Sequence, residues 1–171
     1  MNKLISATLG VVLGLCILQN NMVYASIPEG WRVADSEDQI DDWARFNSPN
    51  KITADFNGDG KEDLAQILLS ATKNKGYKLI VQMSLNDQVR VFNLDQRDDI
   101  PAQSMAIELA EPSNEVWESA CEKGYWKCAD SEIRQFKITK PSIQFCYIES
   151  SCSIYMWSDR KKDFINIPLS D

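Results

Sequence analysis

The chain has 171 residues, of which 44% are hydrophobic and 25% charged, a composition typical of a globular domain and not of a disordered or fibrous chain. It carries 25 acidic and 18 basic residues, a net charge of -7, and an acidic surface repels the phosphates of nucleic acids. It has no histidine, which excludes serine–histidine and cysteine–histidine nucleophile systems, histidine-ligated zinc and histidine acid–base catalysis.

Residues 1–25 have the pattern of a secretory signal peptide. Lys3 gives a positive start, residues 4–18 are mostly apolar, and Val23 and Ala25 are small residues at the −3 and −1 positions of a cleavage site. The apolar stretch is shorter than the roughly 20 residues of a transmembrane helix, so a membrane anchor is the weaker alternative. We expect cleavage after Ala25, a periplasmic or secreted location, and one globular β-rich domain over residues 26–171 without a membrane span.

One helix is predicted in the mature chain, at residues 37–45. Ser36 is a suitable N-cap, and Gln39 stands three residues later, which is the spacing of a capping box. Ile40 and Trp43 then follow at helical spacing.

The rest of the mature chain has the pattern of β-strands, because short apolar or alternating runs are separated by turn residues. Residues 85–87 suit a tight hairpin, and the last four runs have the regular spacing of an antiparallel meander. The predicted fold class is α+β, mainly antiparallel β-sheet with one N-terminal helix. The predicted strands cover residues 51–54, 64–70, 77–84, 88–94, 104–109, 133–138, 142–148, 153–157 and 164–167.

Residues 55–63 read D-x-N-x-D-G-x-x-D. Alternate positions direct side-chain oxygens toward a common centre and a backbone carbonyl can add another ligand, a hard-oxygen set that suits Ca²⁺ better than Mg²⁺. Three carboxylates this close would repel one another without a cation, whereas the alternative is a solvated acidic turn. We expect one structural Ca²⁺, with the ligands Asp55, Asn57, Asp59, the carbonyl of Lys61, and Asp63.

This loop departs from the EF-hand loop, which carries Glu at position 12, where this chain has Gln66. It resembles instead the shorter calcium loops of FG-GAP and VCBS repeats, which join two β-strands. In those repeats an acid at the ninth position completes the coordination, and Asp63 matches it. The resemblance covers residues 52–69 and implies a strand–loop–strand calcium site. It does not imply a propeller, because the chain has one such loop.

Four cysteines remain once the leader, which contains Cys16, is removed. An even number in an exported chain predicts disulfides. Three pairings are possible; we favour 121–128 and 146–152, short loops that contribute about 2–3 kcal/mol each in the chain-entropy model. A zinc site is the weaker alternative, because the cysteines of each pair lie farther apart than in common zinc motifs. The four residues are Cys121, Cys128, Cys146 and Cys152.

A longer pattern is similar to that of a family of small exported bacterial proteins. Its features are the single calcium loop, the C-x-K-G-Y-W-x-C segment at residues 121–128, and an aromatic C-terminal hairpin that ends in Ser-Asp. Together they cover most of the mature chain, and Cys146 and Cys152 are additional to the pattern. The resemblance implies a shared fold unit and carries no activity with it.

Tyr125 and Trp126 are the candidate recognition residues, because a disulfide-closed loop would hold their rings outward as a binding surface. The other tryptophan and tyrosine side chains are expected in the core.

The preferred functional interpretation is an exported, calcium-binding, non-enzymatic binding module whose partner is a protein or an envelope component. Its acidity and compartment suit an inhibitor or immunity-type protein directed against a cationic envelope-targeting enzyme. One alternative is a carboxylate-based or calcium-dependent hydrolase of the cell envelope. Another is a purely structural envelope protein.

Overall fold

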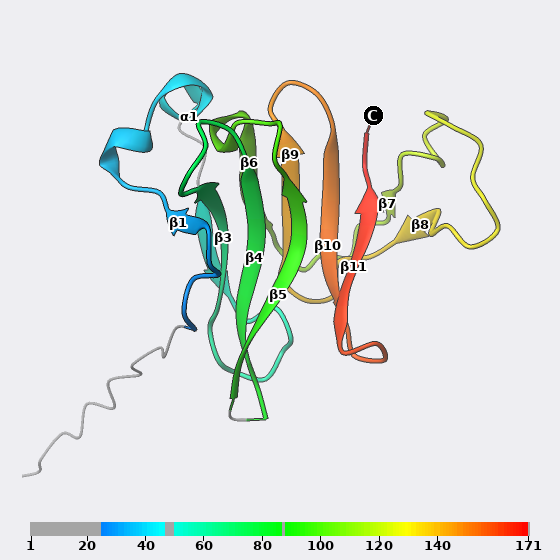
Figure 1. Cartoon of the computed structure of the whole chain (residues 1–171). Helices are drawn as coiled ribbons and strands as arrows, with labels where there is room; N and C mark the ends of the chain where they lie inside the picture. Colours follow the sequence, from blue (N-terminus) through cyan, green and yellow to red (C-terminus); the bar gives the residue numbers. More distant parts are fainter. Residues whose placement is uncertain (1–24, 47–49, 87, 171) are drawn as a thin grey trace, which may run out of the picture.

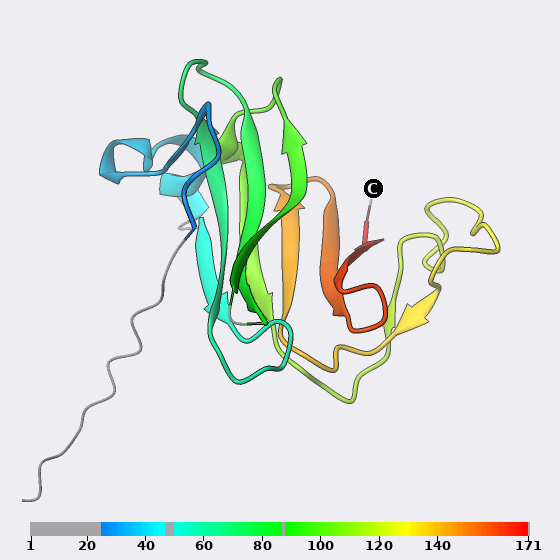
Figure 2. The ribbon, with the colours of Figure 1, turned by 60° about the horizontal axis from the view of Figure 1, so that its bottom comes forward.

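The computed structural model describes residues 25–46, 50–86 and 88–170, which form two β-sheets packed face to face (Figure 1). The first sheet has the order β1-β3-β4-β5, with β2 also paired to β3, and the second has the order β11-β10-β9-β6. Strands β7 and β8 form a separate ribbon on the β11 side (Figures 1 and 2). Strand–strand pairing is antiparallel throughout, which confirms the predicted, mainly antiparallel class. The strands are β1 (Trp31–Val33), β2 (Lys51–Ala54), β3 (Asp63–Ser70), β4 (Tyr77–Leu85), β5 (Gln88–Arg97), β6 (Met105–Ala110), β7 (Trp117–Glu118), β8 (Gln135–Phe136), β9 (Ser142–Tyr147), β10 (Cys152–Ser158) and β11 (Asp163–Pro168).

The main core lies between the two sheets and follows from strand alternation. Successive side chains of a strand point to opposite faces, and Ala65 and Ile67 of β3 belong to the core together with Val81 of β4. The second sheet contributes Phe145 and Trp157 to the same cluster. The intervening β3 and β4 residues therefore lie on the outer face of the first sheet.

The structure differs from the helix predicted at residues 37–45. It has a 3-10 turn, η1 (Ser36–Asp38), and a separate six-residue helix, α1 (Asp41–Phe46). The break is at Asp41, whose φ of 50° is left-handed and cannot belong to a continuous right-handed helix. A further 3-10 turn, η2 (Ala102–Ser104), precedes β6.

The predicted capping box is also shifted by one residue. Asp35, not Ser36, accepts the hydrogen bond from Glu37 N–H at 2.9 Å, and the Asp38 carboxylate accepts from Asp35 N–H at 2.9 Å. Two aspartates three residues apart satisfy the equivalent backbone donors, one residue earlier than the predicted Ser36 and Gln39 pair. Sequence spacing alone did not decide between these overlapping boxes.

Most predicted strands are confirmed within one to three residues at each end. The exception is the strand predicted at residues 133–138, which is reduced to β8 and pairs with β7 instead of joining the meander. The meander itself consists of β9, β10 and β11, and β6 completes that sheet by pairing with β9.

Both predicted disulfides are present, Cys121–Cys128 and Cys146–Cys152. Cys146 and Cys152 face each other as a cross-strand pair of β9 and β10, whereas Cys121–Cys128 closes the turn-rich segment before the β7–β8 ribbon is completed. The predicted leader lies outside the described residues apart from Ala25. Within the part of the chain that the structure describes, no helix is long and apolar enough to cross a membrane.

Candidate metal-binding loop

The acidic loop connects β2 to β3 at one end of the first sheet, where it lies near the β4–β5 hairpin in the lower part of Figure 1 and comes forward in Figure 2. Ala54 pairs with Asp63, so residues 55–62 form the connection. Gly58 and Gly60 have φ values of 77° and 83°, conformations that favour glycine. The strand–loop–strand arrangement predicted from the sequence is therefore present.

The carboxylate of Asp55 organises the start of the loop. Its Oδ1 accepts hydrogen bonds from the backbone N–H groups of Gly58 at 2.7 Å and Asp59 at 3.0 Å. Its Oδ2 accepts from Gly60 N–H at 2.7 Å. Short polar side chains that bond backbone groups a few residues ahead stabilise turns of this kind.

Asn57 and Asp59 continue the pattern along the loop. Asn57 Oδ1 accepts from Asp59 N–H at 2.8 Å, and Asp59 Oδ1 accepts from Lys61 N–H at 2.9 Å. Asn57 is buried, and its Nδ2 donates to the carbonyl of Ser84 on β4 at 3.1 Å. The Asp59 N–H is shared between two of the predicted ligand side chains, Asp55 and Asn57, which places those side chains next to each other.

Asp63 anchors the other end of the loop from the first position of β3. Its side chain is inside the protein, with the residue only 1% exposed. Oδ2 accepts from Phe56 N–H at 3.0 Å and Oδ1 from Ser84 N–H at 3.2 Å. Burial raises the pKa of the Asp63 carboxyl to about 6; the two amide donors lower it, and the charges of Asp59 and Asp55 raise it further.

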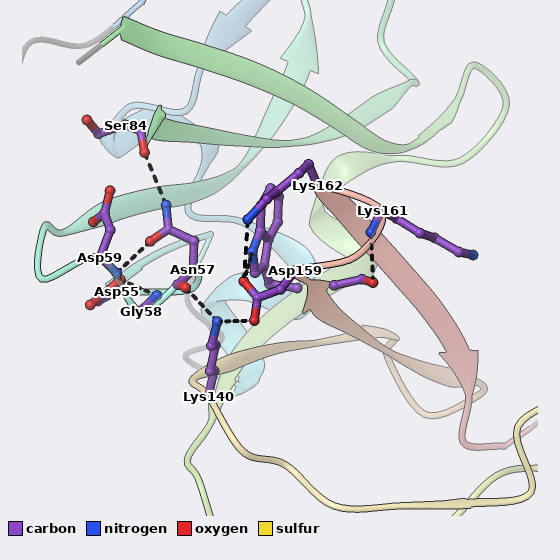
Figure 3. Close-up of polar contacts among 11 residues, drawn as sticks. Asp55, Asn57, Gly58, Asp59, Ser84, Lys140, Asp159, Lys161 and Lys162 are labelled. Atoms are coloured by element: carbon purple, nitrogen blue, oxygen red, sulfur yellow. Dashed lines mark hydrogen bonds and ion pairs between the residues drawn. The ribbon is translucent and has the colours of Figure 1, made fainter. Parts of the chain in front are cut away.

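A lysine from the second half of the chain holds the loop from outside. Lys140 Nζ donates to the carbonyl of Asn57 at 2.7 Å and to Asp159 Oδ2 at 2.7 Å (Figure 3). Asp159 Oδ1 in turn accepts from Trp157 Nε1 at 3.1 Å. The stem of Lys140 packs on Gly58 so closely that a Cβ there would lie 3.1 Å from Lys140 Cε. The loop of the first sheet is thus tied to the β10–β11 turn of the second.

The predicted ligands are brought together only in part. Asp55, Asn57 and Asp59 share one hydrogen-bond network, but the oxygens of Asp63 point to Phe56 and Ser84. The described residues contain no group of three or more Asp, Glu, Cys or His side chains arranged to hold a metal ion. The predicted convergence of three carboxylates is therefore not seen, and metal binding stays a prediction.

Lys140, Asp159 and Ser84 are the loop partners that the sequence did not indicate. Lys140 lies 83 residues from Asn57 in the chain, and no local pattern links positions that far apart. The available signal was Gly58, because a glycine in a loop can mark the close approach of another group.

The two candidate recognition residues differ in their environment. Tyr125 is 52% exposed. Trp126 is only partly exposed, and its Nε1 donates to Glu132 Oε1 at 3.0 Å. Of the other aromatic side chains expected in the core, Trp43, Tyr155 and Trp157 are buried there, and Trp43 donates from Nε1 to the Met105 carbonyl at 2.7 Å. Tyr147 is 41% exposed, contrary to that expectation.

Comparison with protein-family models, curated proteins and solved structures gave no match to this chain.

Proposed function

We propose that the protein is an exported, non-enzymatic binding module whose β2–β3 loop holds one structural Ca²⁺. The observation that carries the proposal is that the side-chain oxygens of Asp55, Asn57 and Asp59 share one hydrogen-bond network in a glycine-containing hairpin loop, which the buried Asp63 closes. The negative charges of Asp55 and Asp59 contribute to the raised pKa of Asp63. A divalent cation in the loop would relieve that repulsion.

The chemistry of the donor set fits calcium. Carboxylate, amide and backbone carbonyl oxygens are the hard ligands that Ca²⁺ takes in six- to eightfold coordination, with water completing the shell. Asp55, Asn57, Asp59 and the Lys61 carbonyl would supply these oxygens, with Asp63 as the closing acid or as the anchor of the loop. The ion would neutralise the charges of the loop and make it rigid. Extracellular modules commonly bind Ca²⁺ with dissociation constants of about 10⁻⁴–10⁻³ M, a range that suits a constitutively bound structural ion.

Export is supported by the disulfides and by the leader pattern. Cys121–Cys128 and Cys146–Cys152 suit an oxidising compartment. In that setting the net charge of -7 favours association with a cationic partner. We therefore propose a protein or envelope component as the partner, with inhibition of a cationic envelope-targeting enzyme as the role, and the exposed ring of Tyr125 as part of the contact.

Thermal unfolding in excess EDTA and in graded Ca²⁺ tests the loop. A ligand at 100 times its dissociation constant stabilises the folded state by about 2.7 kcal/mol, a rise of about 5–10 °C in Tm for a domain of this size. Asp59→Ala should abolish the rise, whereas Asp130→Ala, which removes an exposed acid far from the loop, should leave it intact. Titration calorimetry should show one site. No calcium-dependent shift at millimolar Ca²⁺ would contradict the proposal.

Enzyme activity is tested separately with isolated peptidoglycan as substrate. The non-enzymatic proposal expects no release of soluble fragments with or without Ca²⁺. Release that persists through purification and is lost when one acidic residue outside the loop is replaced would instead identify a hydrolase.

A further inference from the structure

We propose that a groove on the outer face of the first sheet binds the carboxyl-terminal end of an apolar peptide. The inference deepens the proposed function, since it rests on the protein being a binding module and names the chemistry of its partner. It does not depend on calcium, because none of the five predicted loop ligands lines the groove.

The groove is a cavity of about 490 Å³ between the N-terminal segment and the outer face of β2, β3 and β4, within the usual size of ligand sites at roughly 300–1,000 Å³. The N-terminal segment, blue in Figure 1, runs beside β3 to reach β1. A second hollow of about 290 Å³ adjoins it and shares Val33, Lys51 and Gln66. The residues that line the groove include Ile27, Val33, Lys51, Leu64, Gln66 and Gln82.

The side chain of Gln82 contains a buried acceptor that has no hydrogen-bond donor. Gln66 and Gln82 are each 4% exposed on the outer face, where a solvated sheet face would carry exposed polar side chains. Among the described residues, Gln82 Oε1 is the one buried side-chain oxygen or nitrogen without a hydrogen-bond partner. A buried acceptor without a donor is unfavourable. Because Oε1 itself is covered, a ligand N–H in the groove would satisfy it once the Gln82 side chain turns toward the groove that it lines.

Lys51 gives the same groove a free positive charge. It is exposed at the rim and pairs with Gln66 across β2 and β3. No carboxylate among residues 25–46, 50–86 and 88–170 forms an ion pair with its ammonium group. Within the described ranges, the one acid that lines the adjoining hollow, Asp35, accepts from Glu37 N–H and lies 3.8 Å from Arg32.

These features match the end of a peptide chain. The terminal carboxylate complements Lys51, a backbone N–H complements Gln82 Oε1, and an apolar side chain complements Val33, which is 46% exposed, and Leu64. Lys51 and Gln82 stand on strands separated by β3 and are offset by two residues along the strands, so their backbones lie about 12 Å apart. An extended peptide spans that distance in about three to four residues, because each advances about 3.4 Å.

The test uses the exported protein and a set of N-acetylated hexapeptides ending in Val, Leu, Ile or Phe, each as the free acid and as the carboxyl-terminal amide. Calorimetry should show at least one free acid binding below about 1 mM and at least about tenfold more tightly than its amide. Lys51→Gln should remove the difference between acid and amide. Gln82→Met should weaken both forms, and Lys137→Gln, an exposed lysine away from the groove, should change neither.

Two outcomes would overturn the inference: no peptide binding up to about 1 mM, or equal affinity for acids and amides. Sedimentation provides a further check, since a dimer disrupted by Val33→Asp would show that a second copy of the chain covers the groove. Repeating the titrations with Asp59→Ala in EDTA separates the two proposals. Peptide binding should be retained there, because the groove does not need the ion. Wild-type protein that binds the peptide acids but no Ca²⁺ would refute only the calcium loop, and wild-type protein that binds Ca²⁺ but no peptide would refute only the groove.

Discussion

The first sheet contains two buried polar side chains, one with hydrogen-bond partners for both of its oxygens and one whose oxygen has none. At the loop end, Asp63 is 1% exposed, and both of its oxygens accept backbone hydrogen bonds. On the outer face, Gln82 is 4% exposed, and its Oε1 accepts none. The comparison shows that burial of a polar side chain does not by itself indicate its role. A partnered group holds the fold together, whereas an unpartnered one requires an explanation, which the proposed peptide groove would supply for Gln82.

Replacing Asp63 should have the largest effect. Asp63→Ala leaves the N–H groups of Phe56 and Ser84 without acceptors, and we expect a loss of about 3 kcal/mol in the free energy of unfolding. Denaturant unfolding measures it. Asp63→Asn keeps one acceptor and should lose less, which provides a measurement if the alanine variant does not fold. A loss below about 1 kcal/mol for Asp63→Ala would show that the loop end does not depend on this side chain.

Cutting the connection between the loop and the second sheet should have the next largest effect. Lys140→Met removes the hydrogen bond to the Asn57 carbonyl and the ion pair with Asp159, at an expected cost of about 1–2 kcal/mol. Lys162→Met is the matched control, because Lys162 contacts the same aspartate only at 3.9 Å. Thermal unfolding of both variants decides the point, and equal losses would mean that the Asn57 contact contributes nothing.

Replacing Gln82 should raise the stability of the protein instead of lowering it. Gln82→Met removes the unpartnered acceptor in a side chain of similar length, so we expect the protein to gain about 1 kcal/mol of stability. The gain should accompany the loss of peptide binding described above, as is common where a site is kept for function. A destabilised Gln82→Met variant would show that the amide is a structural group after all.

The pair of Asp38 and Arg32 allows a smaller test by pH. The Arg32 guanidinium donates to Asp38 at 2.6 and 2.7 Å and holds the pKa of that carboxyl below its usual value. A lowered folded-state pKa gives stability that is present above the unfolded-state pKa and lost as the pH falls through the folded-state pKa. The Tm difference between wild type and Asp38→Asn should therefore be greatest above about pH 5 and disappear in strong acid. The corresponding difference in the free energy of unfolding should not exceed about 1 kcal/mol, because Arg32 is 42% exposed.

The features that could be predicted from sequence are those set by near neighbours in the chain. The β2–β3 hairpin follows from the glycine-containing loop between two apolar runs, and each disulfide closes a short loop. The prediction of one helix at residues 37–45 was wrong, because Asp35 and Asp38 form a competing cap and the backbone of Asp41 is left-handed. The spacing of residues in the sequence does not show which of the two possible caps forms.

Features that depend on distant residues were not predictable. The contact of Lys140 with Asn57 joins the loop to a segment of the second sheet. The groove requires the N-terminal segment to lie over β3 and β4, so Gln82 looked like an ordinary polar position of an alternating strand. Whether a side chain on the outer face of a sheet is buried depends on the segment that packs over that face. The residues of the strand itself do not specify that segment.

The 83 residues between Asn57 and Lys140 also bear on the order in which the protein assembles. Contacts between residues far apart in the chain form late in folding, because the loop-closure entropy must be overcome before they contribute. A chain that is exported before it folds would present the acidic hairpin to the outside well before Lys140 arrives. We expect the hairpin to reach its final shape only after both sheets have docked. Full protection of the Gly58, Asp59 and Gly60 amides from hydrogen exchange would then mark completed folding.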